Sequence, residues 1–343
     1  MQKVMLAMSG GVDSSVAAHL ILQQGYECVG ATMLLCSDVG VKDAESVANR
    51  LGIPFFAFDH REDFNSLVVE DFINCYEQGG TPNPCVTCNK KIKFDVLLQR
   101  ALEAGCDFLA TGHYARIAPK NGRFLLYKAK DFSKDQSYFL ACLNQHQLSH
   151  TLFPLGELEK AEVRLLAESL DLVNAKKKDS QDICFIPDGD YAAFMERYTG
   201  KSYPQGDYLD ESGNVVGQHQ GAVCYTIGQR KGLGIALGQP VYVSQKDMVA
   251  NTVTVGPEES LFKTTLIADN WNFIPFDTLE APMQIKARVR YRHTEQPATV
   301  YPMEGGLARV EFMKPQRAIT TGQAVVLYDG DMVVGSGRIA QVL

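Results

Sequence analysis

The sequence predicts an α/β domain with a parallel sheet, a small central domain and a C-terminal antiparallel β-barrel. In the first half of the chain, short apolar runs alternate with segments of helical period, which is typical of a parallel sheet covered on both faces. From about residue 188, glycine, tyrosine, aspartate and glutamine become frequent. From about residue 260, short β-prone runs are separated by turn residues, which indicates a small barrel. We therefore expect domains at residues 1–190, 191–258 and 259–343.

The individual elements follow from the hydrophobic period and the turn residues. Buried strands are expected at 3–8, 27–34, 54–59 and 107–114, and helices at 13–25, 43–52, 62–77, 90–105, 135–148 and 160–171. Asn121-Gly122 lies between two apolar runs and predicts a hairpin over 115–128. The glycine-rich segment 225–240 predicts a mobile loop. Because ligands of parallel sheets bind at the carboxyl ends of the strands, we expect the functional site there.

The composition is that of a globular protein, since 45% of the 343 residues are hydrophobic and 21% are charged. No apolar run reaches the roughly 18 residues that a membrane span needs. The N-terminus shows neither the basic region nor the cleavage site of a signal peptide. We therefore expect a cytoplasmic protein with no membrane partner. The net charge of −7 argues weakly against a nucleic-acid partner, but local clusters of cations create fields of their own.

Three clusters of cations occur in the sequence. Two are groups of lysines, at residues 90–93 and 176–178. The third is the segment 284–294, in which a strand would place every second residue on one face. That face would carry Lys286, Arg288, Arg290 and Arg292, with Ile285, Ala287, Val289 and Tyr291 on the other. Four neighbouring cations repel one another, so this face is either a solvated edge or a surface for an anion.

The chain has nine cysteines, an uneven number, and we expect a reducing compartment, where stable disulfides are rare. Cys85 and Cys88 form a Cys-x-x-Cys pair, which is compatible with zinc, redox or iron–sulfur chemistry. A structural zinc is disfavoured, because no second Cys-x-x-Cys or His pair completes four ligands. Apart from Cys184, the other cysteines lie among apolar neighbours and are expected to be structural: Cys28, Cys36, Cys75, Cys106, Cys142 and Cys224.

A Ser-Gly-Gly-Val-Asp-Ser loop, residues 9–14, follows the first strand and leads into the first helix. Glycines let backbone N–H groups approach a ligand, and the N-terminus of a helix adds partial positive charge. The loop therefore predicts a cradle for an anion, although a Gly-Gly pair alone is also compatible with a simple tight turn. No lysine follows the glycines, so this is not the G-x-x-x-x-G-K-[ST] phosphate loop.

This loop resembles the pyrophosphate loop of the N-type ATP pyrophosphatases, which split ATP between its α and β phosphates. Further motifs follow in order: TGHY at 111–114, KDQSYFL at 134–140, LGELEKAEVR at 155–164, KDSQDICFI at 178–186 and GQRKGLGI at 228–235. On these motifs the chain is identified as a member of the tRNA-specific 2-thiouridylase family, which replaces the 2-oxygen of the wobble uridine with sulfur. The resemblance implies an adenine nucleotide α-hydrolase-like (PP-loop) fold for the first domain.

The resemblance also implies roles for the residues at matching positions. ATP would bind at Ala7, Met8, Ser9, Gly10, Gly11, Val12, Asp13, Ser14, Ser15, Met33 and Gly112, with Asp13 as the route to Mg²⁺. The target base would meet Asn83, Pro84 and Cys85. The tRNA would contact His113, Lys134, Asp135, Gln136, Arg290, Tyr291 and Gln323. The implied partners are the tRNAs for Lys, Glu and Gln, and a cysteine desulfurase or sulfur-relay protein as the sulfur donor.

The chemistry of the family assigns the remaining cysteines. ATP would adenylate the C2 oxygen of the uridine, a persulfide on Cys184 would supply sulfur, and Cys88 would be its partner nucleophile. Lysines close to Cys88 and ahead of Cys184, namely Lys90, Lys91 and those at 176–178, are expected to lower the pKa of these thiols. A rival mechanism uses the same residues, because Cys85, Cys88 and Cys184 could instead hold a [4Fe–4S] cluster that binds sulfide.

Two other functions agree with parts of the sequence. A sister pyrophosphatase that amidates a small molecule would share the loop but would give Cys88 and Cys184 no role. A non-catalytic, nucleotide-gated module that binds tRNA would need neither an intact loop nor the two thiols. Both therefore explain fewer of the sequence motifs than a thiouridylase does.

Overall fold

The first sheet is fully parallel and has the strand order β3-β2-β1-β4-β7 in a computed structural model that describes residues 1–170, 172 and 183–343. Its strands are β1 (Lys3–Ala7), β2 (Glu27–Leu34), β3 (Phe55–Asp59), β4 (Phe108–Thr111) and the short β7 (Thr151–Leu152). The chain moves from β1 to β2 and β3 on one side and then returns to β4 on the other. The carboxyl ends of β1 and β4 therefore flank a topological switch point, where such sheets bind ligands.

Alternate residues of β1 face the two halves of the core. Val4 and Leu6 pack against α1 (Val12–Gln23), α2 (Val41–Leu51) and α9 (Lys160–Ser169). Met5 packs on the opposite face, in a cluster with Leu97 of α6 (Leu97–Glu103). The sheet is thus covered on both faces, and the predicted α/β class is confirmed.

Two long helical segments contain π-helical turns. The first consists of α3 (Arg61–Phe64), the π segment η1 (Asn65–Val69) and α4 (Glu70–Glu77). The second consists of α5 (Pro84–Cys88), the π segment η2 (Asn89–Val96) and α6. The prediction that this helix begins at residue 90 was wrong by six residues. Pro84 is its first residue, a position where the missing N–H of proline costs nothing, so Cys85 and Cys88 are its second and fifth residues.

The predicted hairpin is confirmed as β5 (Ala115–Lys120) and β6 (Arg123–Lys128), joined by Asn121 and Gly122 with φ of 53° and 77°. Positive φ at both positions is what a two-residue turn between twisted strands requires. The helix expected over 135–148 is instead two short helices, α7 (Ser137–Leu140) and α8 (Gln145–Ser149). The break has a local cause, because Asn144 caps α8 with its side chain and Gln147 completes the capping box.

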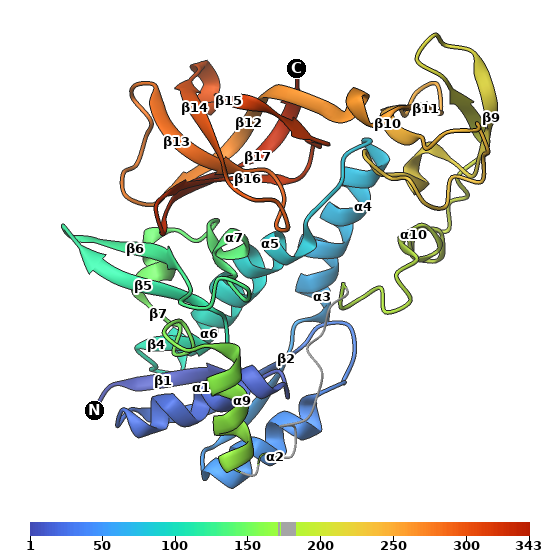
Figure 1. The fold of residues 1–343 in the computed structure, drawn as a ribbon. Helices are drawn as coiled ribbons and strands as arrows, with labels where there is room; N and C mark the ends of the chain where they lie inside the picture. Colours follow the sequence, from blue (N-terminus) through green and yellow to red (C-terminus); the bar gives the residue numbers. More distant parts are fainter. Residues whose placement is uncertain (171, 173–182) are drawn as a thin grey trace.

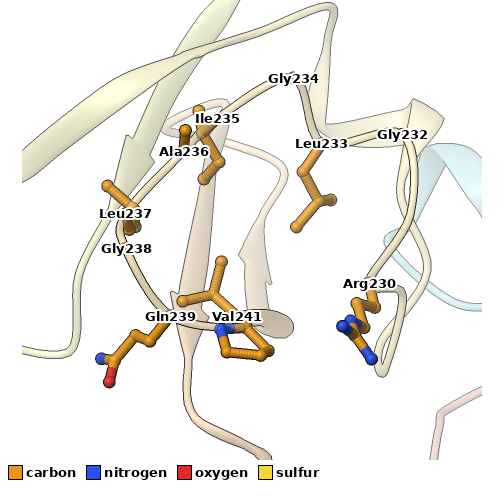
Figure 2. A pocket seen from close by; sticks show the side chains of 11 residues that line it. Arg230, Gly232, Leu233, Gly234, Ile235, Ala236, Leu237, Gly238, Gln239 and Val241 are labelled. Carbon is orange, nitrogen blue, oxygen red and sulfur yellow. The ribbon is translucent and has the colours of Figure 1, made fainter.

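The central part begins with α10 (Tyr191–Thr199), which the sequence did not predict, and forms a four-stranded sheet of order β10-β11-β8-β9. Its strands are β8 (Gly206–Leu209), β9 (Val215–His219), β10 (Tyr242–Asp247) and β11 (Thr252–Gly256), with a 3-10 turn η3 at Ala222–Cys224. Within the glycine-rich segment, residues 230 and 232–241 line an open cavity of about 410 Å³ (Figure 2). Leu233 is buried there, so one side chain anchors the loop to the central core.

The C-terminal strands form a closed antiparallel barrel. The strands are β12 (Phe262–Phe273), β13 (Met283–Arg288), β14 (Gln296–Pro302), β15 (Ala308–Arg317), β16 (Ala324–Asp329) and β17 (Met332–Val342), with short 3-10 turns η4 (Glu258–Leu261) and η5 (Glu304–Gly306). Pairing of β12 with β17 closes the barrel. The β5–β6 hairpin of the first domain extends the same sheet, through Tyr127 opposite Met332. Figure 1 shows the barrel at the upper left and the central part at the upper right, above the parallel sheet.

The cationic strand face expected over 284–294 is only partly present. Strand β13 ends at Arg288, and a bend and turn follow, so Arg290 and Arg292 do not continue the strand. Ala287 and Val289 are buried as expected, and Lys286 is exposed. Arg288 donates to the carbonyl oxygen of His293 at 2.7 Å and is therefore satisfied within the protein. Four free cations in a row do not occur in this segment.

No helix in the described part of the chain combines the length and the hydropathy needed to span a bilayer.

A buried ion pair ties the hairpin to the barrel and generates a prediction about stability. The ammonium of Lys128 lies 2.8 Å from Glu295 and 3.0 Å from the carbonyl oxygen of Gly330, and the two charged side chains are only 11% and 14% exposed. Lys128→Met should destabilise the fold by about 3 kcal/mol, because it leaves the Glu295 carboxylate buried without its partner. Thermal unfolding measures this loss.

The matched control is Lys130→Met, which removes a half-exposed partner of Glu162 at 3.5 Å and should change the thermal midpoint little. Adding Glu295→Gln to Lys128→Met should restore part of the lost stability. Equal midpoints for Lys128→Met and the parent protein would contradict the assigned role of the pair.

Candidate functional site

The loop from Ser9 to Ser15 connects β1 to α1. Gly11 is the N-cap of α1, and no side chain caps the helix. The hydroxyls of Ser14 and Ser15 both donate to the carbonyl oxygen of Gly11, at 3.1 and 2.9 Å. The backbone N–H of Ser9 donates to the Ser14 hydroxyl at 3.2 Å. The serines therefore hold the turn in shape, while the start of α1 is the anion-binding end of a helix.

Two glycines of the site are required by close backbone contact. Gly10 has a φ of +71°, and a β-carbon there would collide with the carbonyl group of Gly40. Gly112 follows β4, and a β-carbon there would lie 2.7 Å from the carbonyl carbon of Asp13 and 2.8 Å from the nitrogen of Ser14. No side chain fits at either place. The segment that follows β4 is thus in direct contact with the start of α1 at the switch point.

Asp13 makes close contacts with two groups that the sequence did not single out. Lys160, at the start of α9, donates to both carboxylate oxygens at 2.7 and 2.8 Å. The hydroxyl of Tyr114 donates to one of the same oxygens at 2.8 Å. A Mg²⁺ ion bound to this carboxylate would have to displace the ammonium of Lys160, so Asp13 as it stands does not fit the role of a metal ligand. It instead positions a nearly buried lysine beside the loop.

His113 connects the nucleotide loop to the cysteine helix. Burial lowers its pKa well below the ordinary value of 6.5, with a further contribution from the charge of Lys93, so the imidazole is neutral. Its Nδ1 lies 2.7 Å from the Thr111 hydroxyl, and its Nε2 lies 3.4 Å from the ammonium of Lys93. Since an ammonium only donates, Nε2 accepts and Nδ1 carries the proton. Lys93 is in the π segment η2 that follows Cys88.

Lys93 is also the cation that acts on the thiols of Cys85 and Cys88. Burial raises the pKa of both thiols, and the charge of Lys93 opposes this. The expectation that lysines lower the pKa of Cys88 was therefore wrong in its net sign, because desolvation outweighs the cation. The expectation also named the wrong lysine, because Lys93 acts on Cys88, whereas the charge of Lys90 acts on Cys142. Residues 176–178 lie outside the described part of the chain.

The thiol in direct contact with Cys184 is that of Cys36. The Cys36 thiol donates to the carbonyl oxygen of Cys184 at 3.5 Å, and both residues are exposed. A hydrogen bond between the two thiols lowers the pKa of Cys36 to about 6 and raises that of Cys184. The charges of Cys88 and Cys85 raise the pKa of Cys184 further, so these thiols lie within electrostatic range. The prediction that Cys36 is a buried structural residue was wrong.

The thiols do not form a ligand set for an iron–sulfur cluster. Among the described residues, no group of three or more His, Cys, Asp or Glu side chains has an arrangement that could hold a metal ion. Cys85 and Cys184 are exposed, whereas Cys88 is buried against an apolar cluster. All nine cysteines are unpaired.

The residues expected at the target base lie at the start of α5, which the barrel holds in place. The side chain of Gln323 donates to the carbonyl oxygens of Thr81 and Pro82 at 2.8 and 3.1 Å. The backbone N–H of Thr81 donates to the carbonyl oxygen of Thr321 at 2.8 Å. Gln323, predicted to contact tRNA, is thus also a positioning residue for the segment that leads into Asn83 and Pro84.

Several other positions predicted to contact tRNA make internal contacts. Asp135 is buried and accepts hydrogen bonds from the backbone of Ala129 and from Ser137. Gln136 accepts from the N–H of Tyr114 at 2.9 Å and so braces the strand end beside Asp13. Asp135 and Gln136 therefore stabilise the backbone next to the site through hydrogen bonds within the protein.

The remaining predicted tRNA contacts are on the barrel side. Arg290 donates to the Thr320 hydroxyl at 2.7 Å and to the carbonyl oxygen of Ile227 at 3.1 Å, and its Nε is buried without a hydrogen-bond partner in the described structure. Tyr291 is half-buried against Phe139, with ring centroids 4.4 Å apart. Lys134, which lies far away in the sequence, is half-buried, and its charge acts on the Tyr291 hydroxyl. At the nucleotide side, Met8 and Met33 lie at the ends of β1 and β2.

Comparison with known proteins agrees with this architecture. A family model described as a tRNA methyl transferase HUP domain matches residues 2–188, a tRNA methyl transferase PRC-barrel domain matches 192–257, and an aminomethyltransferase beta-barrel domain matches 263–339. The fold and the matches define a three-domain protein of the tRNA-modifying class, built on a nucleotide-binding α/β domain.

Full-length relatives identify the family more closely. The chain is 48% identical to "tRNA-specific 2-thiouridylase MnmA" of Clostridium perfringens, over 100% of this chain and 99% of that protein. It is 47% identical to the protein of the same name of Clostridioides difficile, again over 100% and 99%. The chain belongs to the tRNA-specific 2-thiouridylase family, whose members are sulfurtransferases. A solved 4-thiouridine synthetase–RNA complex aligns with 57% of this chain and 50% of that chain at 16% identity, with a TM-score of 0.39.

The contact between Gly112 and the loop predicts the effect of a single methyl group. Gly112→Ala should weaken ATP binding by about 5- to 150-fold, because relieving the overlap with Asp13 and Ser14 costs roughly 1–3 kcal/mol of backbone displacement. Calorimetric titration with ATP measures the affinity. Gly25→Ala is the matched control, since it strains a positive φ of +85° but meets open space and should leave ATP affinity unchanged.

The neutral state of His113 predicts a dependence of stability on pH. The folded-state pKa lies below the unfolded value of about 6.5, so below pH 6.5 the unfolded chain binds a proton that the folded chain does not. Stability should fall by up to about 1.4 kcal/mol per pH unit as the pH decreases from there. His113→Gln should flatten the decline in melting temperature between pH 7 and pH 5. The exposed His146→Gln should not, and equal slopes for all three proteins would refute the assignment.

Proposed function

We propose that the chain converts the wobble uridine of tRNA to 2-thiouridine, using ATP to activate the C2 oxygen and a cysteine persulfide as the sulfur source. The observation that supports this proposal is the chain of neighbours from the loop at Ser9–Ser15, through Gly112 and His113, to Lys93, whose charge acts on the thiols of Cys85 and Cys88. An activating site and a sulfur-delivering site are thus parts of one structure. A methyl transferase, the name that two of the family models bear, would give these thiols no role.

In the activation step, the C2 oxygen of the uridine attacks the α-phosphorus of ATP. The O–P bond forms, the bond to the β-phosphate breaks, pyrophosphate leaves, and the uridine gives up its N3 proton. The start of α1 with its glycine loop is suited to hold the phosphates, and Lys160 adds a cation next to it. Mg²⁺ is a usual companion of ATP and would screen the phosphate charge when bound. Asp13 contributes by orienting Lys160.

In the transfer step, the terminal sulfur of a Cys184 persulfide attacks C2, and AMP leaves with the former uridine oxygen. The base is then joined to Cys184 through a disulfide. The thiolate of Cys88 attacks the sulfur of Cys184, which forms a Cys88–Cys184 disulfide and releases 2-thiouridine after N3 regains its proton. Lys93 supports the Cys88 thiolate against desolvation. Because the described thiols do not form a metal site, no step of this proposal uses a cluster.

The substrate and partners follow from the same proposal. We assign the tRNAs for Lys, Glu and Gln as substrates, with the base received at Asn83, Pro84 and Cys85. An anticodon base is single-stranded and can be turned out into a pocket at modest cost. The sulfur donor is a cysteine desulfurase or a relay protein that reaches the exposed Cys184. Nine unpaired cysteines suit a reducing compartment, and we place the enzyme in the cytoplasm.

The proposal is tested by thiolation of a tRNA transcript with the purified full chain, ATP, cysteine and a cysteine desulfurase, with 2-thiouridine measured by mass spectrometry. Cys88→Ser and Cys184→Ser should each lower thiolation by at least about 100-fold, since each removes a group that forms a bond during transfer. Both variants should still release pyrophosphate when tRNA is added, because activation needs no thiol.

The control variant is Cys224→Ser, which changes a half-buried thiol in the 3-10 turn η3 and should thiolate at the parent rate. Cys85→Ser should stay within about tenfold of the parent in the persulfide mechanism. A brown chromophore in the parent after anaerobic reconstitution, lost together with activity in Cys85→Ser, would replace this mechanism with the cluster. Pyrophosphate release that does not depend on tRNA would favour the small-molecule amidating enzyme, and none at all would favour a binding module.

A further inference from the structure

Cys36 is a thiol that the proposed reaction does not yet use. It lies two residues beyond the end of β2, at the same edge of the sheet as the loop after β1 and Gly112 after β4. Its sulfur donates a hydrogen bond to the backbone of Cys184 at 3.5 Å. The nearest thiol neighbour of the proposed sulfur carrier is therefore not Cys88, which acts on Cys184 only through its charge.

The three thiols differ in their access to solvent. Cys88 is only 9% exposed and packs against Ile92, Val68 and other apolar side chains, whereas Cys36 and Cys184 are exposed. Each round of the proposed transfer leaves a Cys88–Cys184 disulfide, which must be reduced before the next round. Since the Cys88 sulfur is shielded, a thiol can approach this disulfide readily only at the sulfur of Cys184.

We infer that Cys36 is the resolving thiol of the cycle. Its thiolate attacks the Cys184 sulfur of the Cys88–Cys184 disulfide, so that the Cys36–Cys184 bond forms and the bond to Cys88 breaks. Cys88 leaves as a thiolate, and no electron is gained or lost by the protein. The resulting Cys36–Cys184 disulfide is exposed at both sulfurs, and an external dithiol reduces it and is itself oxidised to a disulfide. This inference deepens the proposed function and rests on it for the roles of Cys88 and Cys184.

The first test needs neither tRNA nor ATP. The full chain is equilibrated with reduced and oxidised glutathione, free thiols are alkylated, and the disulfide-linked peptides are identified by mass spectrometry. The expected disulfide joins Cys36 to Cys184 in the parent protein, and Cys36→Ser shifts the linkage to Cys88–Cys184. A Cys88–Cys184 linkage in the parent at the same level as in Cys36→Ser would overturn the inference. Glutathione adducts on Cys184 without any Cys36 linkage would overturn it as well.

The second test follows turnover. With a limiting protein dithiol as reductant, Cys36→Ser should thiolate tRNA about tenfold more slowly than the parent in the steady state and should accumulate the Cys88–Cys184 disulfide. Excess dithiothreitol should restore the rate, which a merely structural role of Cys36 would not allow. Cys224→Ser is the control and should match the parent. If the parent itself makes no 2-thiouridine, the proposed function fails, whereas equal rates for the parent and Cys36→Ser reject only the role of Cys36.

Discussion

The parallel pairing of β1 with β4 is the constraint on which the rest of the site depends. Ala7 lies opposite Thr111 in this pairing, so the loop after β1 and the Gly112–His113 segment after β4 leave the sheet side by side. The contact is so close that only glycine fits at position 112. His113 is thereby fixed next to the nucleotide loop, and through Lys93 it connects that loop to the helix of Cys88. One strand pairing thus joins an anion-binding helix end to a group of thiols.

The π-helical turn after Cys88 is what makes this connection. Lys93 follows Cys88 by five residues, a spacing that faces the same way in a π-helix but not in an α-helix, where three or four residues separate neighbours on a face. The ammonium lies 3.4 Å from a neutral imidazole, and its charge opposes the rise that burial causes in the pKa values of two thiols. The charge of Lys93 therefore acts on the imidazole and on the two thiols, and none of these groups is a carboxylate that would neutralise it. This arrangement supports a thiolate in a place where desolvation disfavours one.

The sequence was sufficient to predict the parallel sheet, the hairpin at Asn121-Gly122 and the loop at residues 9–15, because each has a local signature. It was not sufficient for the start of α5, since Asn83-Pro84 can end a loop as well as begin a helix, nor for Lys93, because a period of 3.6 does not place it beside Cys88. Cys36 was missed for a different reason: its apolar neighbours in sequence suggested burial, while its contact with Cys184 spans 148 residues. Lys160 and Tyr114 were missed because nothing local indicates that they meet at Asp13.

The thiol geometry is a property of the whole chain and not of the first domain. Cys85 and Cys88 lie within the first five residues of a helix, and helix ends fray unless something fixes the preceding segment. Here that segment is fixed by the C-terminal barrel, through the backbone bond from Thr81 to Thr321 and the two hydrogen bonds from Gln323. Gly322 lies close to Cys75 of α4 at the same place, since a β-carbon on Gly322 would come within 2.5 Å of the Cys75 sulfur, so no larger residue fits there. The barrel therefore holds the start of the helix that carries Cys85 and Cys88, and removing it would loosen the segment that carries two of the thiols near the proposed sulfur-transfer site.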